Sequence, residues 1–122
     1  MPKPEYEFHV PQGEWRPAGG EVDGIWEQIL SFNPDNGDYT RLLRFEAGVD
    51  SSPNGTFTHD FWEEVFIVEG DLTDLRLEST FKAGMYACRP PGMPHGPWRS
   101  EGGVLMLEIR YGFPEPVSQT SS

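Results

Sequence analysis

The chain has 122 residues and a mass of 13.8 kDa, a length typical of one compact domain. Its 20 acidic and 9 basic side chains give a formal charge of −11, which argues against nucleic acid or an anionic membrane surface as a partner. Binding to either requires clustered Lys and Arg that neutralise phosphates. Aromatic residues make up 13% of the chain, a content that acidic disordered chains lack, so the sequence predicts a folded protein.

Glycine and proline residues occur along the whole chain and mark its predicted turns. The 14 glycines and 12 prolines interrupt the apolar runs at short intervals and disfavour long helices. Between these turns lie seven short segments rich in β-branched and aromatic residues, which are predicted to be strands. In chain order they are residues 6–10, 24–31, 39–46, 63–69, 73–77, 85–89 and 104–111. Many short strands separated by turns predict an all-β sandwich or barrel.

No internal repeat or change of composition divides the chain. Residues 1–122 are therefore predicted to form a single domain, with a core at about residues 15–112. Residues 114–122 have almost nothing to bury and are expected to form a loose tail. Acidic residues that include Glu14, Glu21, Asp23 and Glu27 are interpreted as solvated surface.

Cysteine content and the N-terminal residues bear on location. The single cysteine, Cys88, excludes an intramolecular disulfide and a thiolate zinc cluster. The N-terminus has no apolar signal-peptide core, and no apolar run is long enough to span a bilayer. The predicted location is therefore a reducing cytoplasm.

Two of the three histidines fall in the most patterned parts of the chain. If residues 57–67 keep the alternation of a strand, His59 and Glu63 point into an otherwise apolar interior. An imidazole and a carboxylate are costly there unless they are paired or bind a metal. A buried His–Glu pair is the structural alternative for this stretch alone. His9, which lies next to aromatic residues, is interpreted as structural.

The second patterned stretch covers residues 84–98, where Pro and Gly on both sides hold His95 in a rigid turn at a strand end. Two imidazoles and one carboxylate form a facial triad with open positions, which suits Fe(II) and is also accessible to Mn, Ni or Zn. Such a metal polarises a carbonyl, generates hydroxide or binds O₂ beside a substrate. His59, Glu63 and His95 are therefore the candidate ligands.

These two stretches resemble the two motifs of the cupin superfamily, Gly-X5-His-X-His-X3,4-Glu-X6-Gly and Gly-X5-Pro-X-Gly-X2-His. Six residues separate Glu63 from Gly70, and every fixed position of the second motif is matched, by Gly84, Pro90, Gly92 and His95. The chain is similar to small single-domain (RmlC-like) cupins, namely the cupin domain of zinc-binding anti-sigma factors and acetylacetone-cleaving dioxygenases. The resemblance implies an all-β jelly-roll barrel, or double-stranded β-helix, with a metal-centred pocket.

One position departs from the first motif, because its first His falls on Phe57, a side chain that does not coordinate. The resemblance thus carries over three ligands rather than four. The nearby carboxylates of Asp60 and Glu64 are expected to point outward by strand alternation. Of the 20 acidic residues, Glu63 is the one expected to face inward.

Side chains near the ligands supply the expected substrate pocket. Phe57 and Phe61 are predicted to form an apolar wall, and Tyr86 and Arg89 to contact the substrate or support the site. A guanidinium binds a carboxylate in a fork, so Arg89 is a candidate to orient an anionic group, with a structural ion pair as its alternative. Cys88 is interpreted as a small strand residue with no adjacent base to activate it.

The resemblance implies a metal-dependent enzyme that acts on a small, partly apolar organic substrate, with an oxygenase of the diketone-cleaving type favoured. Its cofactor is one divalent metal ion, Fe(II) ahead of Mn, Ni or Zn. Two alternatives stay open: a non-catalytic sensor that binds a ligand or metal, and a metal-dependent lyase or isomerase. Small cupins also resemble one another in forming homodimers, which predicts a homodimer here.

Overall fold

The protein is described by a computed structural model that covers residues 3–115 and contains strands and one 3-10 helix but no α-helix in that range. The elements in chain order are β1 (Arg16–Pro17), β2 (Ile25–Phe32), β3 (Tyr39–Phe45), η1 (Ser52–Asn54), β4 (Trp62–Asp74), β5 (Ser79–Lys82), β6 (Tyr86–Arg89), β7 (Trp98–Arg99) and β8 (Val104–Tyr111). All strand pairs between these elements are antiparallel. Within residues 3–115 no helix is long and apolar enough to cross a membrane.

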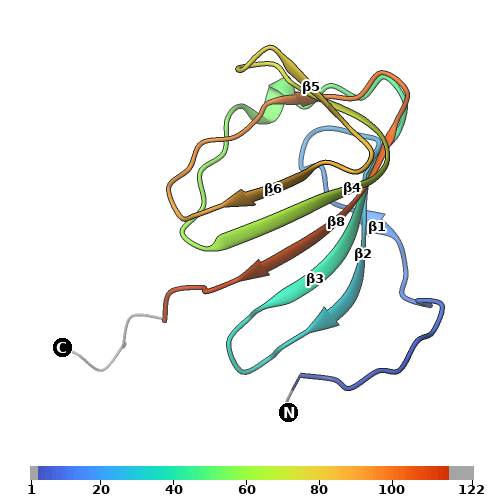
Figure 1. The fold of residues 1–122 in the computed structure, drawn as a ribbon, viewed down its shortest axis with the longest axis vertical. Helices are drawn as coiled ribbons and strands as arrows, with labels where there is room; N and C mark the ends of the chain where they lie inside the picture. Colours follow the sequence, from blue (N-terminus) through green and yellow to red (C-terminus); the bar gives the residue numbers. More distant parts are fainter. Residues whose placement is uncertain (1–2, 116–122) are drawn as a thin grey trace.

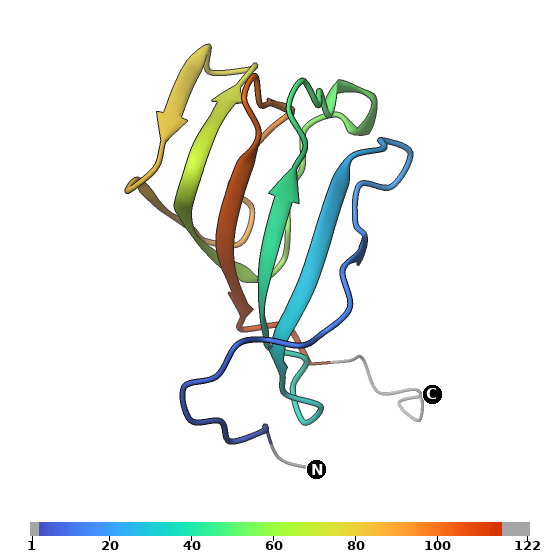
Figure 2. The same cartoon turned by 90° about the vertical axis from the view of Figure 1, so that its right-hand side faces the viewer.

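The strands form one curved sheet in the order β1-β2-β3-β8-β4-β5, and β6 and β7 also pair with β4 (Figures 1 and 2). The long strand β4 joins the two sides of the barrel. Its first part lies between β8 and β6, whereas its last residues pair with β5 and β7. The change of partners follows a bulge between Ile67 and Glu69, which bends the strand.

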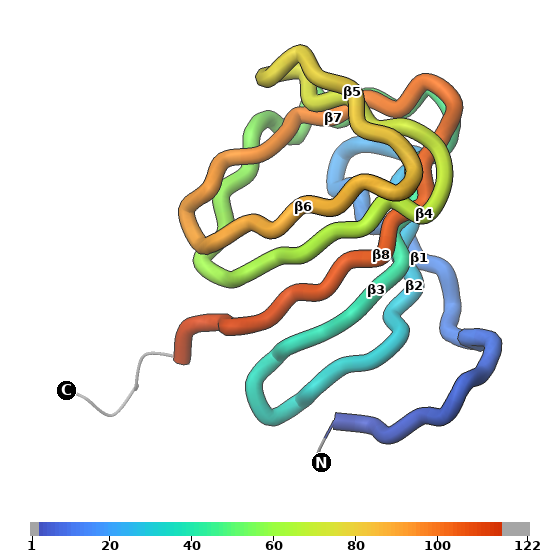
Figure 3. Tube along the Cα trace, in the orientation of Figure 1, coloured from blue at the N-terminus to red at the C-terminus, as the bar shows by residue number. Residues whose placement is uncertain are grey.

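Two connections close the barrel opposite the sheet. The segment from β3 to β4 runs beside the segment from β6 to β7 (Figure 3), where Asp50 pairs with Arg99 and Phe57 pairs with His95. The backbone of Phe57 both donates to and accepts from His95, at 2.8 and 2.9 Å. These bridges hold two loops together that are far apart in sequence.

The core consists of inward-facing apolar side chains from β2, β3, β4, β7 and β8. Its members are Ile25, Leu43, Phe45, Val65, Ile67, Leu72, Trp98, Val104 and Met106. They alternate with outward-facing residues along each strand, as expected for a sheet with one buried face.

The predicted all-β jelly-roll fold is confirmed, and five of the seven predicted strands correspond to β2, β3, β4, β6 and β8. The prediction for residues 6–10 is wrong, because this segment pairs with no strand and Phe8 is fully exposed. The prediction for residues 73–77 holds only for Thr73 and Asp74, which end β4, and is wrong for residues 75–77. There the Asp74 carboxylate accepts the backbone N–H groups of Arg76 and Leu77 and closes a turn after β4. Of the predicted tail, residues 116–122 lie outside the described part of the chain.

Gly70 occupies the tightest corner of β4. Its φ is +90°, and a Cβ atom there would lie 2.0 Å from the carbonyl oxygen of Gly103. Gly84 has a similar φ of +91°, but a Cβ atom there meets nothing within 4 Å. The two positions thus share a backbone requirement and differ in the space around them.

We expect Gly84→Ala to lower the free energy of unfolding by about 1–2 kcal/mol, the cost of a left-handed backbone for a residue with a Cβ atom. Gly70→Ala adds a clash with backbone and is expected to cost at least about 3 kcal/mol. Urea unfolding of both variants measures the difference. Equal losses would contradict the role of the Gly103 contact.

Candidate metal centre

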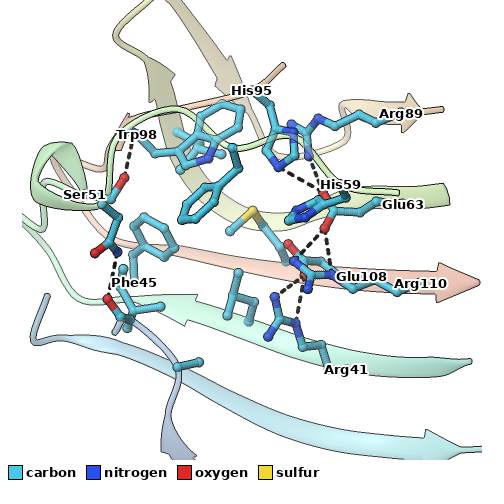
Figure 4. A pocket seen from close by; sticks show the side chains of 18 residues that line it. Arg41, Phe45, Ser51, His59, Glu63, Arg89, His95, Trp98, Glu108 and Arg110 are labelled. Atoms are coloured by element: carbon cyan, nitrogen blue, oxygen red, sulfur yellow. Dashed lines mark hydrogen bonds and ion pairs between the residues drawn. The ribbon is translucent and has the colours of Figure 1, made fainter. Parts of the chain in front are cut away.

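A cavity of about 240 Å³ lies inside the barrel between the sheet and the two closing segments (Figure 4). One end is mainly apolar, with Phe45 and Trp98 among its walls. The other end gathers charged and ionisable side chains, namely Arg41, His59, Glu63, Arg89, His95, Glu108 and Arg110. The cavity therefore has an apolar half and an ionic half.

The structure brings the three predicted ligands together at the ionic end. One donor atom from each of His59, Glu63 and His95 lies within 4.8 Å of the others. His59 precedes β4, Glu63 is on β4, and His95 is in the segment between β6 and β7. The loops are fixed by the bridge at Phe57 and by the N–H of Gly92, which donates to the His59 carbonyl at 2.8 Å.

Both histidines are held in the neutral form. Burial lowers the pKa of His59, and the nearby charge of Arg110 lowers it further. Burial and the charge of Arg89 lower the pKa of His95 to about 4. A neutral imidazole offers a free lone pair, which is the form that binds a metal.

The Glu63 carboxylate is 2% exposed and carries two ion pairs. Its Oε1 accepts from Arg89 at 2.7 Å, and its Oε2 accepts from Arg110 Nε at 2.8 Å and lies 2.7 Å from Arg110 Nη2. Burial acts to raise the pKa of Glu63, but the charges of Arg110 and Arg89 outweigh it and hold the pKa below its ordinary value. The carboxylate is therefore ionised.

Glu63 belongs to a row of alternating charges that crosses the inner face of the sheet. In strand order β1, β2, β3, β8, β4 and β6, the row runs through Arg16, Glu27, Arg41, Glu108, Arg110, Glu63 and Arg89. Consecutive nitrogen–oxygen distances are 3.0, 2.8, 2.8, 3.7, 2.7 and 2.7 Å. We call these seven residues the charge ladder.

The charge ladder corrects the expectation that Glu63 is the one inward-facing acid. Glu108 and Asp74 are also buried, at 5% and 1% exposure, and the Glu27 side chain is 13% exposed and ion-paired rather than solvated. Sequence reasoning missed Glu108 because the strand alternation applied to residues 57–67 was not applied to β8. There Val104, Met106 and Glu108 share the buried face.

The donor set fits a divalent ion on two observations. The Nε2 atom of His59 is buried and has no hydrogen-bond partner among the described residues. Glu63 Oε1 accepts one N–H and lies 3.9 Å from His95 Nε2. An ionised carboxylate has about four acceptor sites, so Oε1 keeps capacity for a further bond. The three residues therefore retain donors for a metal although Glu63 is already paired.

Two phenylalanines pack on the His59 ring. Phe57 lies in the cavity wall, with ring centroids 6.0 Å from His59 and 6.1 Å from His95. Phe61 stacks on His59 at 4.5 Å and lies 5.2 Å from the Arg110 guanidinium. Phe61 is not among the residues that line the cavity, so it supports the His59 ring from the side.

The other two predicted pocket residues, Arg89 and Tyr86, lie on opposite faces of β6. Arg89 lines the cavity, where it pairs with Glu63 and lies 5.0 Å from the Trp98 ring. Tyr86 is not in the wall of this cavity, because it is on the outer face of β6, 59% exposed, and donates its hydroxyl to Glu64. Glu64 is thus directed outward, as alternation predicted.

The remaining singled-out residues lie away from the three ligands. Asp60 is exposed, and so is Cys88 on β6. His9 is exposed, and its Nδ1 donates to the Glu7 carbonyl at 2.8 Å. Cys88 is thus a strand residue, whereas His9 lies in the N-terminal segment that pairs with no strand.

Residues 5–111 match the family of ChrR cupin-like domains. No curated protein sequence matches the chain. Similar solved structures are less than 25% identical to this chain, so the likeness shows a shared fold alone.

An RmlC-like cupin from Shewanella frigidimarina is 21% identical, with a TM-score of 0.68, over 90% of this chain and 93% of that chain. An acetylacetone dioxygenase from Acinetobacter johnsonii is 20% identical, with a TM-score of 0.69, over 87% of this chain and 73% of that one. The complex of Rhodobacter sphaeroides SigE with the anti-sigma ChrR gives 20% identity and a TM-score of 0.61, over 83% of this chain and 51% of that chain.

We expect Glu63→Gln to lower the free energy of unfolding of the metal-free protein by about 3–5 kcal/mol, because it leaves the buried guanidinium of Arg89 and the partly buried one of Arg110 without a full counter-charge. Glu64→Gln is the matched control, since the neighbouring side chain faces outward and bonds tyrosine hydroxyls. Urea unfolding in the presence of a chelator compares the two. Similar losses in both variants would contradict the structural role of the Glu63 ion pairs.

The two histidines also predict a pH dependence of stability in the metal-free protein. Their folded-state pKa values lie below the ordinary value of about 6.5, so the unfolded chain binds more protons than the folded one below pH 6.5, and for His95 this range extends down to about pH 4. The free energy of unfolding should therefore fall as the pH drops through this range, by up to about 1.4 kcal/mol per pH unit for each histidine. Denaturant unfolding of the wild type and of His95→Gln measures it, and an unchanged slope in the variant would contradict the assignment to His95.

Proposed function

Because the chain belongs to the family of ChrR cupin-like domains, we propose that it is a metal-dependent enzyme for a small, partly apolar organic substrate. His59, Glu63 and His95 hold one divalent metal ion in this proposal. The observation that carries it is the buried His59 Nε2, which lacks a partner among residues 3–115 and belongs to a donor set within 4.8 Å. An unpaired polar atom is costly in a protein interior unless a ligand satisfies it.

Two neutral imidazoles and one carboxylate favour Fe(II), with Mn, Ni and Zn as further candidates. When bound, such an ion supplies Lewis-acid activation of a carbonyl or a binding position for O₂. Arg89 and Arg110 keep Glu63 ionised and fix the direction of its carboxylate. Phe57, in the place of a fourth ligand, leaves that position without a donor.

The shape of the cavity supports a compact substrate. Since a cavity of about 150 Å³ holds benzene, a volume near 240 Å³ accommodates on the order of ten non-hydrogen atoms. The apolar end, with Phe45 and Trp98, takes the hydrocarbon part and excludes water. The carbonyl or hydroxyl part of the substrate then lies at the ionic end, beside the three ligands.

A diketone-cleaving oxygenase is the reaction we favour. The likeness to an acetylacetone dioxygenase supports this choice only through the fold, since the identity is 20%. A lyase or isomerase that uses the same three ligands is the alternative within the enzyme class.

A non-catalytic sensor is the second candidate function. The family description and the likeness to the SigE–ChrR complex support it. In a sensor the same donor set would bind metal without turnover. A measurement of oxygen consumption distinguishes the oxygenase from the sensor, whereas metal content does not, since both would bind metal.

The cytoplasmic location stays a prediction from the sequence. We also propose that the protein forms a homodimer. Support for the dimer comes from large apolar side chains exposed on the outer face of three neighbouring strands. These are Trp62 and Phe66 on β4, Tyr86 on β6 and Ile109 on β8, each between 38% and 59% exposed. Large apolar side chains exposed on neighbouring strands are typical of an interaction surface. The solution mass measured by light scattering is the direct test of the dimer.

Elemental analysis of the purified protein, supplied with Fe, Mn, Ni and Zn, tests the metal centre. We expect about one ion per chain in the wild type and near loss in His59→Ala and His95→Ala, since each removes one of three ligands. Phe57→His is expected to raise the affinity at least about tenfold by adding an imidazole donor. Equally little metal in the wild type and in all three variants would refute the metal centre.

Oxygen uptake on a panel of β-diketones and α-hydroxyketones tests the reaction. The Fe(II)-loaded wild type is expected to consume O₂ with at least one β-diketone, whereas His95→Ala is expected to consume none. Metal binding without uptake across the panel would rule against the oxygenase and favour the sensor or the lyase. Uptake that persists in His95→Ala would show that the reaction does not depend on this centre.

A further inference from the structure

A second cavity, of about 170 Å³, lies beside the cavity of the metal centre. The side chains of Arg89, His95 and Trp98 line both cavities and so form the wall between them. The remaining walls are mainly apolar and include Ile67, Ala87, Leu77, Phe81, Met85 and Met93. Neither the metal ligand His59 nor Glu63 reaches this second cavity.

Asp74 gives the second cavity its one buried carboxylate among the described residues. The residue is 1% exposed, and its Oδ1 accepts the N–H groups of Arg76 and Leu77, both at 2.9 Å. No Lys, Arg or His in the described range lies within 4.0 Å of the carboxylate. Arg76, the nearest cation in sequence, instead donates to the Pro94 carbonyl at 3.2 Å.

This carboxylate contrasts with the buried acids of the charge ladder. Glu63 and Glu108 each contact an arginine, as a carboxylate in an interior normally must. The buried Asp74 carboxyl group instead has two backbone donors on one oxygen, no cationic side chain within 4.0 Å in the described range and an apolar hollow beside it. A ligand that places a cation in the hollow would supply the missing counter-charge.

We propose that the second cavity binds a small aromatic or alicyclic amine, with its ring among the apolar side chains and its ammonium group on Asp74. Its volume fits a single six-membered ring, since a cavity of about 150 Å³ lined by aliphatic and aromatic residues holds benzene. The ammonium donates to the second oxygen of the carboxylate, so the turn made by Oδ1 is kept. This site is independent of the metal, because it uses no metal ligand except the side of the His95 ring in the shared wall.

Binding is tested on the chelator-treated protein with benzylamine, benzyl alcohol and benzoate as probes that share a ring. Titration followed by calorimetry should give affinity in the order benzylamine, benzyl alcohol, benzoate, with at least about tenfold between the first and the last, because Asp74 attracts a cation and repels an anion. Methionine methyl resonances locate the probe. Those of Met85 and Met93 should shift, while that of Met106, in the first cavity, should not.

Three variants make the test specific. Asp74→Asn keeps an acceptor for the two backbone N–H groups and should lower benzylamine affinity at least about tenfold while leaving benzyl alcohol nearly unchanged. Ala87→Met fills the second cavity and should abolish binding of every probe. Ala18→Met, which adds the same volume to the first cavity, should leave binding intact.

Several outcomes would overturn the proposal. They are no binding of benzylamine at millimolar concentration, benzoate bound as tightly as benzylamine, or benzylamine affinity that is unchanged in Asp74→Asn. Shifts at Met106 without shifts at Met85 and Met93 would place the probe in the wrong cavity and would also refute it. Since Asp74→Asn and the methionine shifts do not depend on Ala87→Met, the test stands even if that variant does not fold.

Discussion

The structure depends on the charge ladder that crosses six strands of the sheet. Buried charges are expensive, and the six inner members of the ladder, from Glu27 to Arg89, are tolerable only because a neighbour on the next strand or the same strand carries the opposite sign. The ladder also specifies register. A slip of one residue in β3 or β8 would turn Arg41, Glu108 and Arg110 to the other face and leave their partners unpaired.

The same ladder explains how the proposed metal centre and the stable fold share one residue, Glu63. Glu63 is the last acid of the row, and its two arginines fix its carboxylate before any ion arrives. His59 and His95 reach it from the two closing segments, which the backbone bridge at Phe57 holds together. The three candidate ligands are thus positioned by the sheet on one side and by the two closing segments on the other, an arrangement that would preorganise a metal site.

Strand alternation predicted correctly which side chains of β4 face inward and which face outward. It placed Glu63, Val65 and Ile67 inward and Glu64 outward, and all four are so directed. The prediction from β-branched and aromatic content failed for residues 6–10, which have no neighbouring strand, because pairing and burial rather than local propensity decide strand formation.

Tyr86 shows a limit of a different kind. The same alternation that buries Arg89 on β6 turns Tyr86 outward, but alternation was applied only to residues 57–67 and not to the strand predicted at residues 85–89. The charge ladder needed still more, namely the order of strands across the sheet. A sequence read along the chain does not reveal that Arg41, Glu108 and Glu63 are neighbours in space.

The pairing of charges inside the barrel also determines the field outside it. The ladder holds four of the nine basic residues and three of the twenty acidic ones. The whole acidic excess of the chain therefore lies outside the ladder, and the molecule as a whole has a negative potential at low ionic strength. Divalent cations and organic cations accumulate near such a molecule, whereas anionic solutes are kept away. Both effects weaken when added salt shortens the screening length.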